Sequence, residues 1–179
     1  MTRTLAILLS LTLFFGATTM AKKTKAAENP LENTLYLDLK DGRVVIEMRP
    51  DLAPKHVKRI KELTHQGFYD GIVFHRVIDG FMAQTGDPTG TGMGGSKEPD
   101  LPAEFNAEHF ARGIVGMARS QSPDSGNSQF FVMLAEGGFL DGQYTVWGSV
   151  DAEGMKCVDQ IAKGEPPANP DKMTKVTVQ

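Results

Sequence analysis

Apolar and polar residues alternate along two neighbouring segments near position 40. In "TLYLDLK" (34–40) every second residue is a leucine, and in "RVVIEM" (43–48) every second residue is apolar. This period of two predicts β-strands that bury one face. The Asp-Gly pair at 41–42 that joins the two segments is a strong turn signal, so together they predict a β-hairpin.

Helical spacing replaces this alternation in two places. Apolar residues recur every three or four positions between Pro54 and Gly67, where the proline suits a first helical turn and the glycine suits the position just past a helix end. A second such segment, 154–163, ends at Gly164. The chain is therefore expected to contain two α-helices.

The rest of the chain favours further strands separated by turns. The predicted strands do not alternate with helices, so a parallel sheet is not indicated. Gly and Pro, which favour turns, are frequent, at 19 and 10 residues. The predicted fold class is mainly β: a closed eight-stranded antiparallel barrel capped by two α-helices. The six further predicted strands are 72–78, 81–85, 113–118, 129–134, 144–150 and 173–178.

The first residues are typical of an export signal. A short basic start precedes the apolar run 5–15, and small residues precede a cleavage site after Ala21. We expect a signal peptide at 1–21, a flexible lead-in at 22–33 and one domain at 34–179. The expected location is a bacterial periplasm, with no stable membrane association after cleavage.

An uncleaved membrane anchor is the alternative for this segment. The apolar run is shorter than the roughly 20 residues that a spanning helix needs, which argues against an anchor. Lys22, Lys23 and Lys25 follow the cleavage site at once, which argues against efficient cleavage. Both hypotheses, a cleaved signal peptide and an uncleaved anchor, stay open. An uncleaved anchor would hold the domain at the inner membrane.

Composition excludes several classes of function. The 179 residues carry a net charge of −3 without a long basic block, so no nucleic-acid partner is expected. Cys157 is the only cysteine, so an internal disulfide is impossible, and a buried structural thiol is expected there. We expect a monomer.

Cofactor and metal chemistry also lack their residues. "GTGMGG" (90–95) matches the dinucleotide pattern, but two prolines follow within a few residues and no helix can start there, so it is interpreted as a mobile surface loop. The histidines show no metal-ligand spacing. His56 and His65 are expected on a solvated helix, and His75 as a hydrogen-bonded core residue. Neither a metal nor a cofactor is predicted.

One arginine interrupts an apolar, strand-like run. In "FHRVIDGFMAQTGD" (74–87), alternation places Arg76 on one face with Phe74 and Ile78. The simple alternative is that this side chain extends to solvent from a sheet edge. If the neighbouring strand faces meet instead, they form an apolar floor with a polar rim: Phe81, Met82 and Phe131, with Arg76, Gln84 and Gln129.

This run, followed by "GMA", "SQFF" and "FLDG", resembles the signature set of the cyclophilin-type peptidyl-prolyl cis-trans isomerases, and the likeness extends from Thr34 to the C-terminus. The resemblance implies an eight-stranded barrel with two capping helices. It also implies an enzyme that accelerates X–Pro bond rotation in unfolded or extended polypeptides and so assists folding. Such an enzyme forms no covalent intermediate and needs no cofactor.

The resemblance also assigns the site. Arg76 corresponds to the family's catalytic arginine. Phe139 and Tyr144 stand where the best-known eukaryotic members carry Trp and His; this combination resembles bacterial members and is expected to weaken cyclosporin binding but not isomerisation. The remaining substrate-binding positions are the proline pocket (Phe81, Met82, Phe131, Leu140), a glutamine near the proline (Gln84), and a wall for the preceding residues (Ala118, Arg119, Gln129).

Two other classes of function remain as alternatives. A binding module or holdase would use the same groove to grip proline segments without turnover, but it would not need the arginine. A lipocalin-like ligand barrel would need an open interior, whereas aromatic residues such as Phe130 are expected to fill it.

Overall fold

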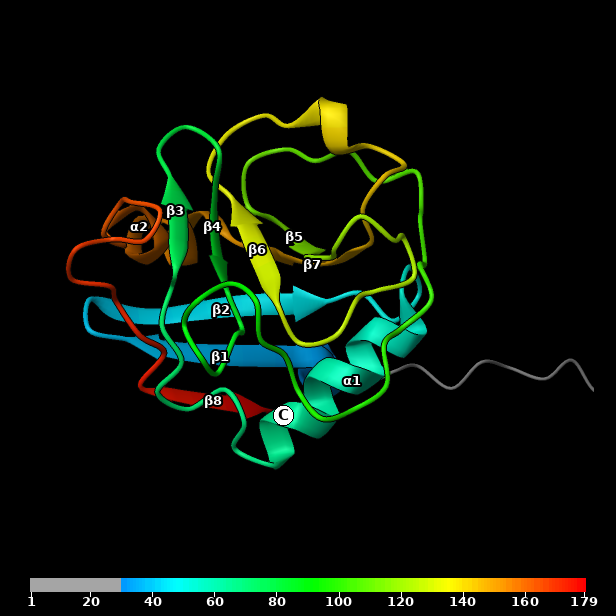
Figure 1. Ribbon diagram of the computed structural model, residues 1–179, viewed down its shortest axis with the longest axis horizontal. Coiled ribbons are helices and arrows are strands. Elements are labelled where there is room, and N and C mark those ends of the chain that lie inside the picture. The colour runs from blue at the N-terminus through cyan, green and yellow to red at the C-terminus, as the bar shows by residue number, and fades with distance from the viewer. Residues whose placement is uncertain (1–29) are drawn as a thin grey trace, which may run out of the picture.

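The computed structural model describes residues 30–179, so the predicted signal peptide and most of the lead-in lie outside the described residues. Eight strands and two α-helices follow one another in the predicted order (Figure 1). The elements are η1 (Pro30–Asn33), β1 (Thr34–Leu39), β2 (Gly42–Met48), α1 (Pro54–His65), β3 (Arg76–Ile78), β4 (Met82–Thr85), β5 (Ile114–Met117), β6 (Phe130–Met133), η2 (Gly138–Leu140), β7 (Val146–Val150), α2 (Ala152–Asp159) and β8 (Lys175–Val178).

The predicted hairpin and the first helix are confirmed. β1 and β2 pair antiparallel from Thr34 to Leu39, and Leu39 faces Gly42 across the turn. α1 begins at Pro54 and ends just before Gly67, whose φ of 69° lies in the left-handed region that glycine adopts without strain.

The second helix is displaced from its predicted range of 154–163. The side chain of Asp151 accepts a hydrogen bond from the Gly154 backbone N–H at 2.7 Å and caps a helix that starts at Ala152. The helix ends at Asp159, and Ile161 is buried beyond it in irregular backbone. Cys157 in this helix is half-buried rather than fully buried, and its thiol lies 3.5 Å from the Asp41 carbonyl oxygen.

All eight strands belong to one antiparallel sheet in the order β3-β4-β6-β5-β7-β2-β1-β8. The predicted closure of the barrel is not confirmed, because no ladder joins the two edge strands β3 and β8 among the described residues. β3 has only three residues, and the backbone before it meets the backbone before β8 through single contacts such as the bridge between Val73 and Lys172. The result is a strongly curled, open sheet.

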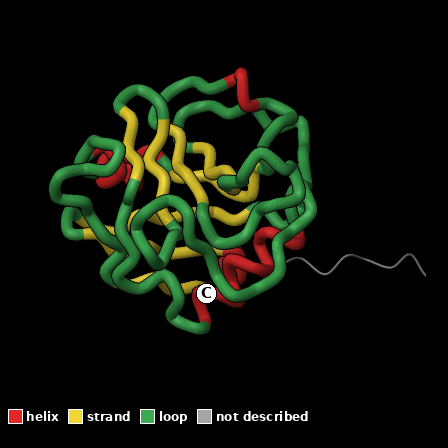
Figure 2. Tube along the Cα trace, viewed as in Figure 1, coloured by secondary structure: helices red, strands yellow, loops and turns green. Residues whose placement is uncertain are grey.

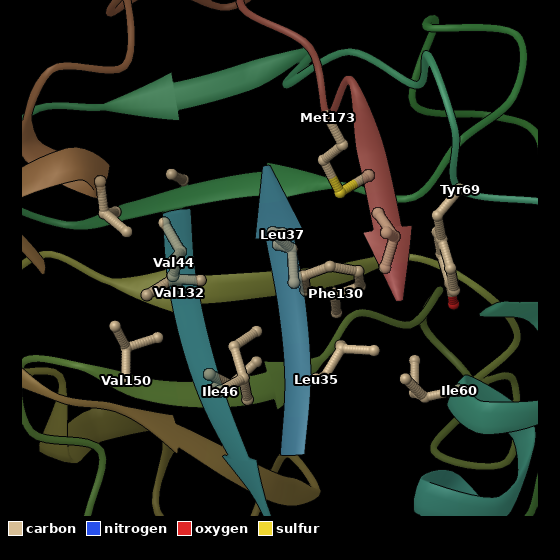
Figure 3. Close-up of a cluster of buried hydrophobic side chains, with 14 of the residues drawn as sticks. Leu35, Leu37, Val44, Ile46, Ile60, Tyr69, Phe130, Val132, Val150 and Met173 are labelled. Carbon is tan, nitrogen blue, oxygen red and sulfur yellow. The ribbon is translucent and has the colours of Figure 1, made fainter. Parts of the chain in front are cut away.

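The concave side of this sheet holds the main core. Phe130 and Trp147 fill its centre with their rings 5.4 Å apart, so the interior has no room for a lipocalin-type ligand. α1 packs against β7 and β8, and α2 packs against β2, near opposite ends of the long strands β1 and β2 (Figure 1). Figure 3 shows side chains from several strands meeting there, among them Leu35, Leu37, Ile46, Phe130 and Val132.

A second, smaller apolar cluster lies on the opposite face of β4 and β6, here called the outer face. Along β6, Phe130 and Val132 point into the main core, whereas Phe131 and Met133 point to the outer face. Loops surround this part of the sheet (Figure 2), and the longest connection, 86–113, joins β4 to β5. The outer cluster consists of Met82, Phe110, Phe131, Met133, Leu140 and Val146.

Candidate functional site

One row of residues crosses four adjacent strands on the outer face. Arg76 on β3 is paired with Gln84 on β4, Gln84 with Phe131 on β6, and Phe131 with Gly116 on β5. Residues directly opposite each other in an antiparallel pair share a face. A cation, an amide, an aromatic ring and a position without a side chain therefore stand side by side.

Gly116 leaves the space that the Phe131 ring occupies. A Cβ atom at Gly116 would lie 2.5 Å from Phe131 Cζ and 2.7 Å from Phe110 Cε1. The two aromatic rings stack with centroids 5.8 Å apart. The floor of the site is thus a packed aromatic pair over a backbone that carries no side chain.

A small cavity of about 160 Å³ opens over this row. It is well below the roughly 300–1,000 Å³ of sites for drug-sized ligands, so it suits one side chain or one small ring. Its floor is apolar and its rim carries the polar groups. The lining residues are Arg76, Phe81, Met82, Gln84, Ala118, Arg119, Phe131, Leu140 and Tyr144.

Arg76 lies at the rim of this cavity. Its Nε donates a hydrogen bond to Glu165 Oε2 at 2.7 Å, while its Nη1 lies 4.0 Å from the sulfur of Met82 on the floor. The side chain is 41% exposed. The guanidinium thus spans from an ion pair at the surface to the apolar floor, so the side chain, although partly exposed at a sheet edge, is not turned away from the cavity.

Gln84 links the small cavity to a larger one. Its side-chain amide donates to Gln129 Oε1 at 2.9 Å, and the Gln129 amide donates in turn to the carbonyl oxygens of Gly92 and Gly94 at 3.0 and 2.8 Å. The neighbouring cavity has a volume of about 440 Å³ and shares Gln84, Ala118 and Arg119 with the small one. The two cavities are therefore adjacent and share one wall, and together they are here called the groove.

The glycine-rich loop 90–95 borders the larger cavity and is held by Asp87. The carboxylate of Asp87 accepts hydrogen bonds from the backbone N–H groups of Thr89, Thr91, Gly92 and Gly94. Burial alone would raise the pKa of this carboxyl, but the hydrogen bonds outweigh burial and lower the pKa to about 2. No helix follows the loop, as predicted, but its backbone is fixed by these bonds rather than free.

Arg119 braces the other wall of the groove. Its guanidinium lies 4.5 Å from the ring centroid of Tyr144, and its Nε and Nη2 donate to the Gln143 carbonyl oxygen at 3.1 and 3.0 Å. The Tyr144 ring meets Phe131 edge to face at 5.8 Å. Arg119 therefore orients an aromatic ring that lines the small cavity.

The structure brings together the site residues predicted from the sequence. All of them line the small cavity except Gln129, which lines the larger cavity, and Phe139. The Phe139 ring lies 5.5 Å from that of Phe81 and is 65% exposed, so it extends the rim outward. The prediction that Phe74 shares a face with Arg76 is wrong, because Phe74 lies in the main core.

Sequence reasoning missed Glu165 and the role of the glycine-rich loop. Nothing near Glu165 in sequence points to the site, because its contact with Arg76 depends on a bridge between distant segments. The glycines of loop 90–95 permit close backbone approach, which could have indicated that the loop borders a binding site. The sequence was compared only with the dinucleotide-binding pattern, and the loop was interpreted as a mobile surface loop.

The histidines differ in part from expectation. His56 is buried, not solvated, and its Nδ1 lies 2.7 Å from Glu104 Oε2. His65 is exposed, as expected. His75 is buried, as expected, but neither ring nitrogen meets hydrogen-bond geometry with a partner within residues 30–179, so the prediction of a hydrogen-bonded ring is not confirmed. The same residues contain no group of three or more His, Cys, Asp or Glu arranged to hold a metal ion.

Comparison with known sequences identifies one family. The family model "Cyclophilin type peptidyl-prolyl cis-trans isomerase/CLD" matches residues 34–178. A "Probable peptidyl-prolyl cis-trans isomerase" of Brucella suis biovar 1 is 54% identical over 175 aligned positions, which cover 89% of this chain and 88% of that protein. A "Peptidyl-prolyl cis-trans isomerase-like 1" of Aspergillus oryzae is 40% identical over 130 positions, covering 69% of this chain and 78% of that protein.

Solved structures give the same result. A cyclophilin from Hirschia baltica superposes with a TM-score of 0.76 at 30% identity, covering 84% of this chain and 74% of that one. A cyclophilin-type isomerase from Cryptosporidium parvum, crystallised in the presence of the dipeptide Ala-Pro, superposes with a TM-score of 0.74 at 27% identity. The match covers 82% of this chain and 98% of that one.

Proposed function

The chain belongs to the cyclophilin-type peptidyl-prolyl cis-trans isomerases and catalyses rotation about X–Pro bonds, and from this premise we propose that Arg76 and the small cavity carry the reaction. One observation supports the assignment: a guanidinium stands at the rim of an apolar cavity whose volume suits a single ring. Arg76 is the catalytic residue. The substrate-binding residues are Phe81, Met82, Gln84, Ala118, Arg119, Gln129, Phe131, Phe139, Leu140 and Tyr144.

The chemical task is to lower a rotational barrier. Delocalisation of the nitrogen lone pair into the carbonyl gives a peptide bond a barrier of about 18–20 kcal/mol. An X–Pro bond therefore exchanges over tens to hundreds of seconds when uncatalysed. A turnover of about 10²–10³ s⁻¹ requires the barrier to fall by roughly 6 kcal/mol.

A cation at the cavity rim lowers this barrier by binding the twisted amide better than either planar form. When the bond is half rotated, the prolyl nitrogen becomes pyramidal and regains a lone pair that accepts a hydrogen bond. The guanidinium of Arg76 donates to that nitrogen and can also hold the prolyl carbonyl oxygen. Arginine suits this task because it is permanently charged and presents a rigid fork of donors.

The apolar floor holds the proline ring while the preceding chain turns. Met82 and Phe131 supply the floor, and Gln84 stands next to Arg76 to hold the peptide backbone. Rotation breaks no bond between heavy atoms, so the step needs neither a nucleophile nor a cofactor.

The groove favours extended polypeptides as substrates. The two cavities share Gln84 and Ala118, so a chain whose proline sits in the small cavity can lay its preceding residues along the larger one. The Ala-Pro dipeptide in the Cryptosporidium parvum crystals is consistent with such a ligand. Unfolded chains expose prolines in this way, so we propose that the enzyme assists protein folding. We also propose that it acts as a monomer.

The enzyme acts in a bacterial periplasm after cleavage of residues 1–21. The layout of the leader supports this location, and retention of the leader as an inner-membrane anchor is the alternative. Residues 30–179 include no helix long and apolar enough to cross a bilayer. Mass spectrometry of the mature N-terminus distinguishes the two: a start at Lys22 supports cleavage, and an intact Met1 supports the anchor.

The test of the catalytic role compares the wild type with Arg76→Ala on a cis-proline tetrapeptide. We expect kcat/KM to fall by about 10² or more, because the charge that meets the twisted amide is lost. Arg43→Ala is the matched control, since Arg43 on β2 pairs with Asp38 on β1 and does not line the cavity. Near-normal activity of Arg76→Ala would contradict the proposal and favour a holdase that only grips proline segments.

A further inference from the structure

Glu165 lies directly opposite Arg76 although 89 positions separate them in sequence. Val77 and Gly164 form an antiparallel bridge in which each backbone N–H donates to the other residue's carbonyl oxygen at 2.8 Å. In an antiparallel pair, the residue before one partner faces the residue after the other. The bridge therefore places Glu165 across from Arg76, on the same face.

The side chains use this register to form a charge-assisted hydrogen bond. Arg76 Nε donates to Glu165 Oε2 at 2.7 Å, a distance typical of an N–H donor on a carboxylate. The other end of the guanidinium, Nη1, lies 4.0 Å from Met82 Sδ at the cavity floor. Glu165 thus holds the inner nitrogen of the group while the terminal nitrogen Nη1 lies at the cavity floor.

The segment that carries Glu165 is itself fixed. Asp171 accepts a hydrogen bond from the Ala162 backbone N–H at 2.8 Å and pairs with Lys40 Nζ at 2.7 Å. The Asp171 carbonyl oxygen also accepts the Phe74 backbone N–H at 2.8 Å, just before β3. The position of Glu165 relative to Arg76 therefore follows from backbone contacts and does not depend on their ion pair.

Folding stability does not account for this pair. The side chains are 41% and 52% exposed, and exposed ion pairs contribute little to stability. We propose that Glu165 is a positioning residue for the isomerase reaction, holding the guanidinium of Arg76 at the rim of the proline cavity before substrate arrives. This inference rests on the catalytic role proposed above for Arg76.

Two opposing effects decide the direction of the expected change. A free arginine side chain has several rotatable bonds, and ordering them in the transition state would raise the barrier. A carboxylate beside the guanidinium also reduces its positive potential, which would weaken its hold on the twisted amide. Solvent screens this second effect at an exposed pair, so positioning prevails and loss of Glu165 lowers the rate.

The experiment measures kcat and KM separately for three variants on a prolyl tetrapeptide. Glu165→Ala is expected to lower kcat about tenfold with KM within about twofold, because the proline cavity itself is unchanged. Glu165→Gln keeps an acceptor oxygen and is expected to recover most of kcat. Glu153→Ala is the matched control, because Glu153 pairs with Lys156 on α2 and does not contact the cavity; it is expected to leave both constants unchanged.

A spectroscopic readout and a second background separate the possible outcomes. In NMR spectra, the Nε–H of Arg76 is expected to be protected from solvent exchange in the wild type and to lose that protection in Glu165→Ala. Adding Glu165→Ala to Arg76→Ala is expected to cause no further loss of rate. The positioning role alone is overturned if Glu165→Ala causes an equal loss of rate in the Arg76→Ala background. It is also overturned if Glu165→Ala has a wild-type or higher kcat while Arg76→Ala is impaired. Normal activity of Arg76→Ala would instead overturn the proposed catalytic role.

Discussion

Gly116 and Phe131 face each other across the β5–β6 ladder, and a methyl group at Gly116 would come within 2.5 Å of the Phe131 ring. The cavity floor is thus shaped by an absent side chain as much as by those present. Phe110 stacks against this ring, and the same methyl group would come within 2.7 Å of it. Any added volume at Gly116 must therefore displace one or both rings of the pair that forms the cavity floor.

Gly116→Ala is therefore expected to harm both stability and binding. Overpacking of this kind costs about 1–3 kcal/mol, and the displaced ring is expected to raise KM several-fold while kcat changes less. Thermal unfolding and steady-state kinetics measure the two effects. The double variant Gly116→Ala/Phe131→Leu removes the clash with Phe131, but not the one with Phe110, and should recover part of the lost melting temperature. A Gly116→Ala protein with wild-type stability and KM would show that the floor is not tightly packed.

Gln84 is expected to be needed for rate rather than for folding. Gln84→Ala removes the hydrogen bond to Gln129 Oε1, so Gln129 is then held only by its two bonds to the glycine-rich loop. We expect kcat/KM to fall about tenfold, with a stability loss of about 1 kcal/mol, typical of one hydrogen bond. Gln160→Ala, at an exposed position after α2, is the control. A loss of stability without a loss of rate would make Gln84 structural only.

Acid should weaken the loop that borders the larger cavity. Because the pKa of Asp87 is lowered from 3.8 to about 2, its stabilising contribution is present above pH about 4 and is lost as pH falls through about 2. A shift of this size corresponds to about 2 kcal/mol. Asp87→Asn should thus be less stable than the wild type in urea at pH 7, and the gap should narrow toward pH 2.

Asp159→Asn serves as the matched variant, since Asp159 is exposed and pairs with Arg112 at the surface. Its small difference from the wild type should not follow the same pH course. A constant gap between wild type and Asp87→Asn from pH 7 to pH 2 would contradict the role assigned to the Asp87 carboxylate.

A histidine beside η2 is expected to respond to pH in the opposite sense. His109 Nδ1 lies 2.7 Å from Asp141 Oδ2 and Nε2 lies 2.9 Å from Glu136 Oε2, and hydrogen bonds to Asp141 and then Glu136 raise its pKa above 6.5. The contribution of protonated His109 is fully present below pH 6.5 and is lost as pH rises through the raised pKa.

The measurement is amide hydrogen exchange of residues 138–140 at several pH values. After correction for the intrinsic exchange rate, protection should fall above the pKa of His109 in the wild type and show little of this trend in His109→Gln. His56 is an internal reference in an NMR titration, because burial lowers its pKa despite its bond to Glu104. If the His109 ring titrated at or below 6.5, the two carboxylate contacts would not hold in solution.

Alternation along single strands predicted most of the site. Met82 and Gln84 on β4 are two residues apart and therefore share a face. Pairing of β4 with β6 brings Phe131 onto the same face, opposite Gln84. The predicted floor and rim followed from this period of two, whereas the role of Arg76 came from the family resemblance. Local periodicity is reliable where a strand is regular.

The errors lie where the backbone is irregular or the contact is distant. The strand that contains Arg76 begins only at that residue, so alternation does not extend back to Phe74. The open edge between β3 and β8 and the placement of Glu165 both depend on how segments about 90 or more positions apart approach each other. No short sequence pattern encodes such an approach.

We propose that Arg76 binds the half-rotated amide in preference to either planar form. The most direct measurement is NMR exchange spectroscopy of a proline peptide on the enzyme, which gives the rate of cis–trans interconversion in the complex and the affinity for each isomer. For Arg76→Ala we expect affinities within about threefold of the wild type and an interconversion rate lower by about 10² or more. An unchanged interconversion rate, or a loss explained entirely by weaker binding of the planar peptide, would contradict it.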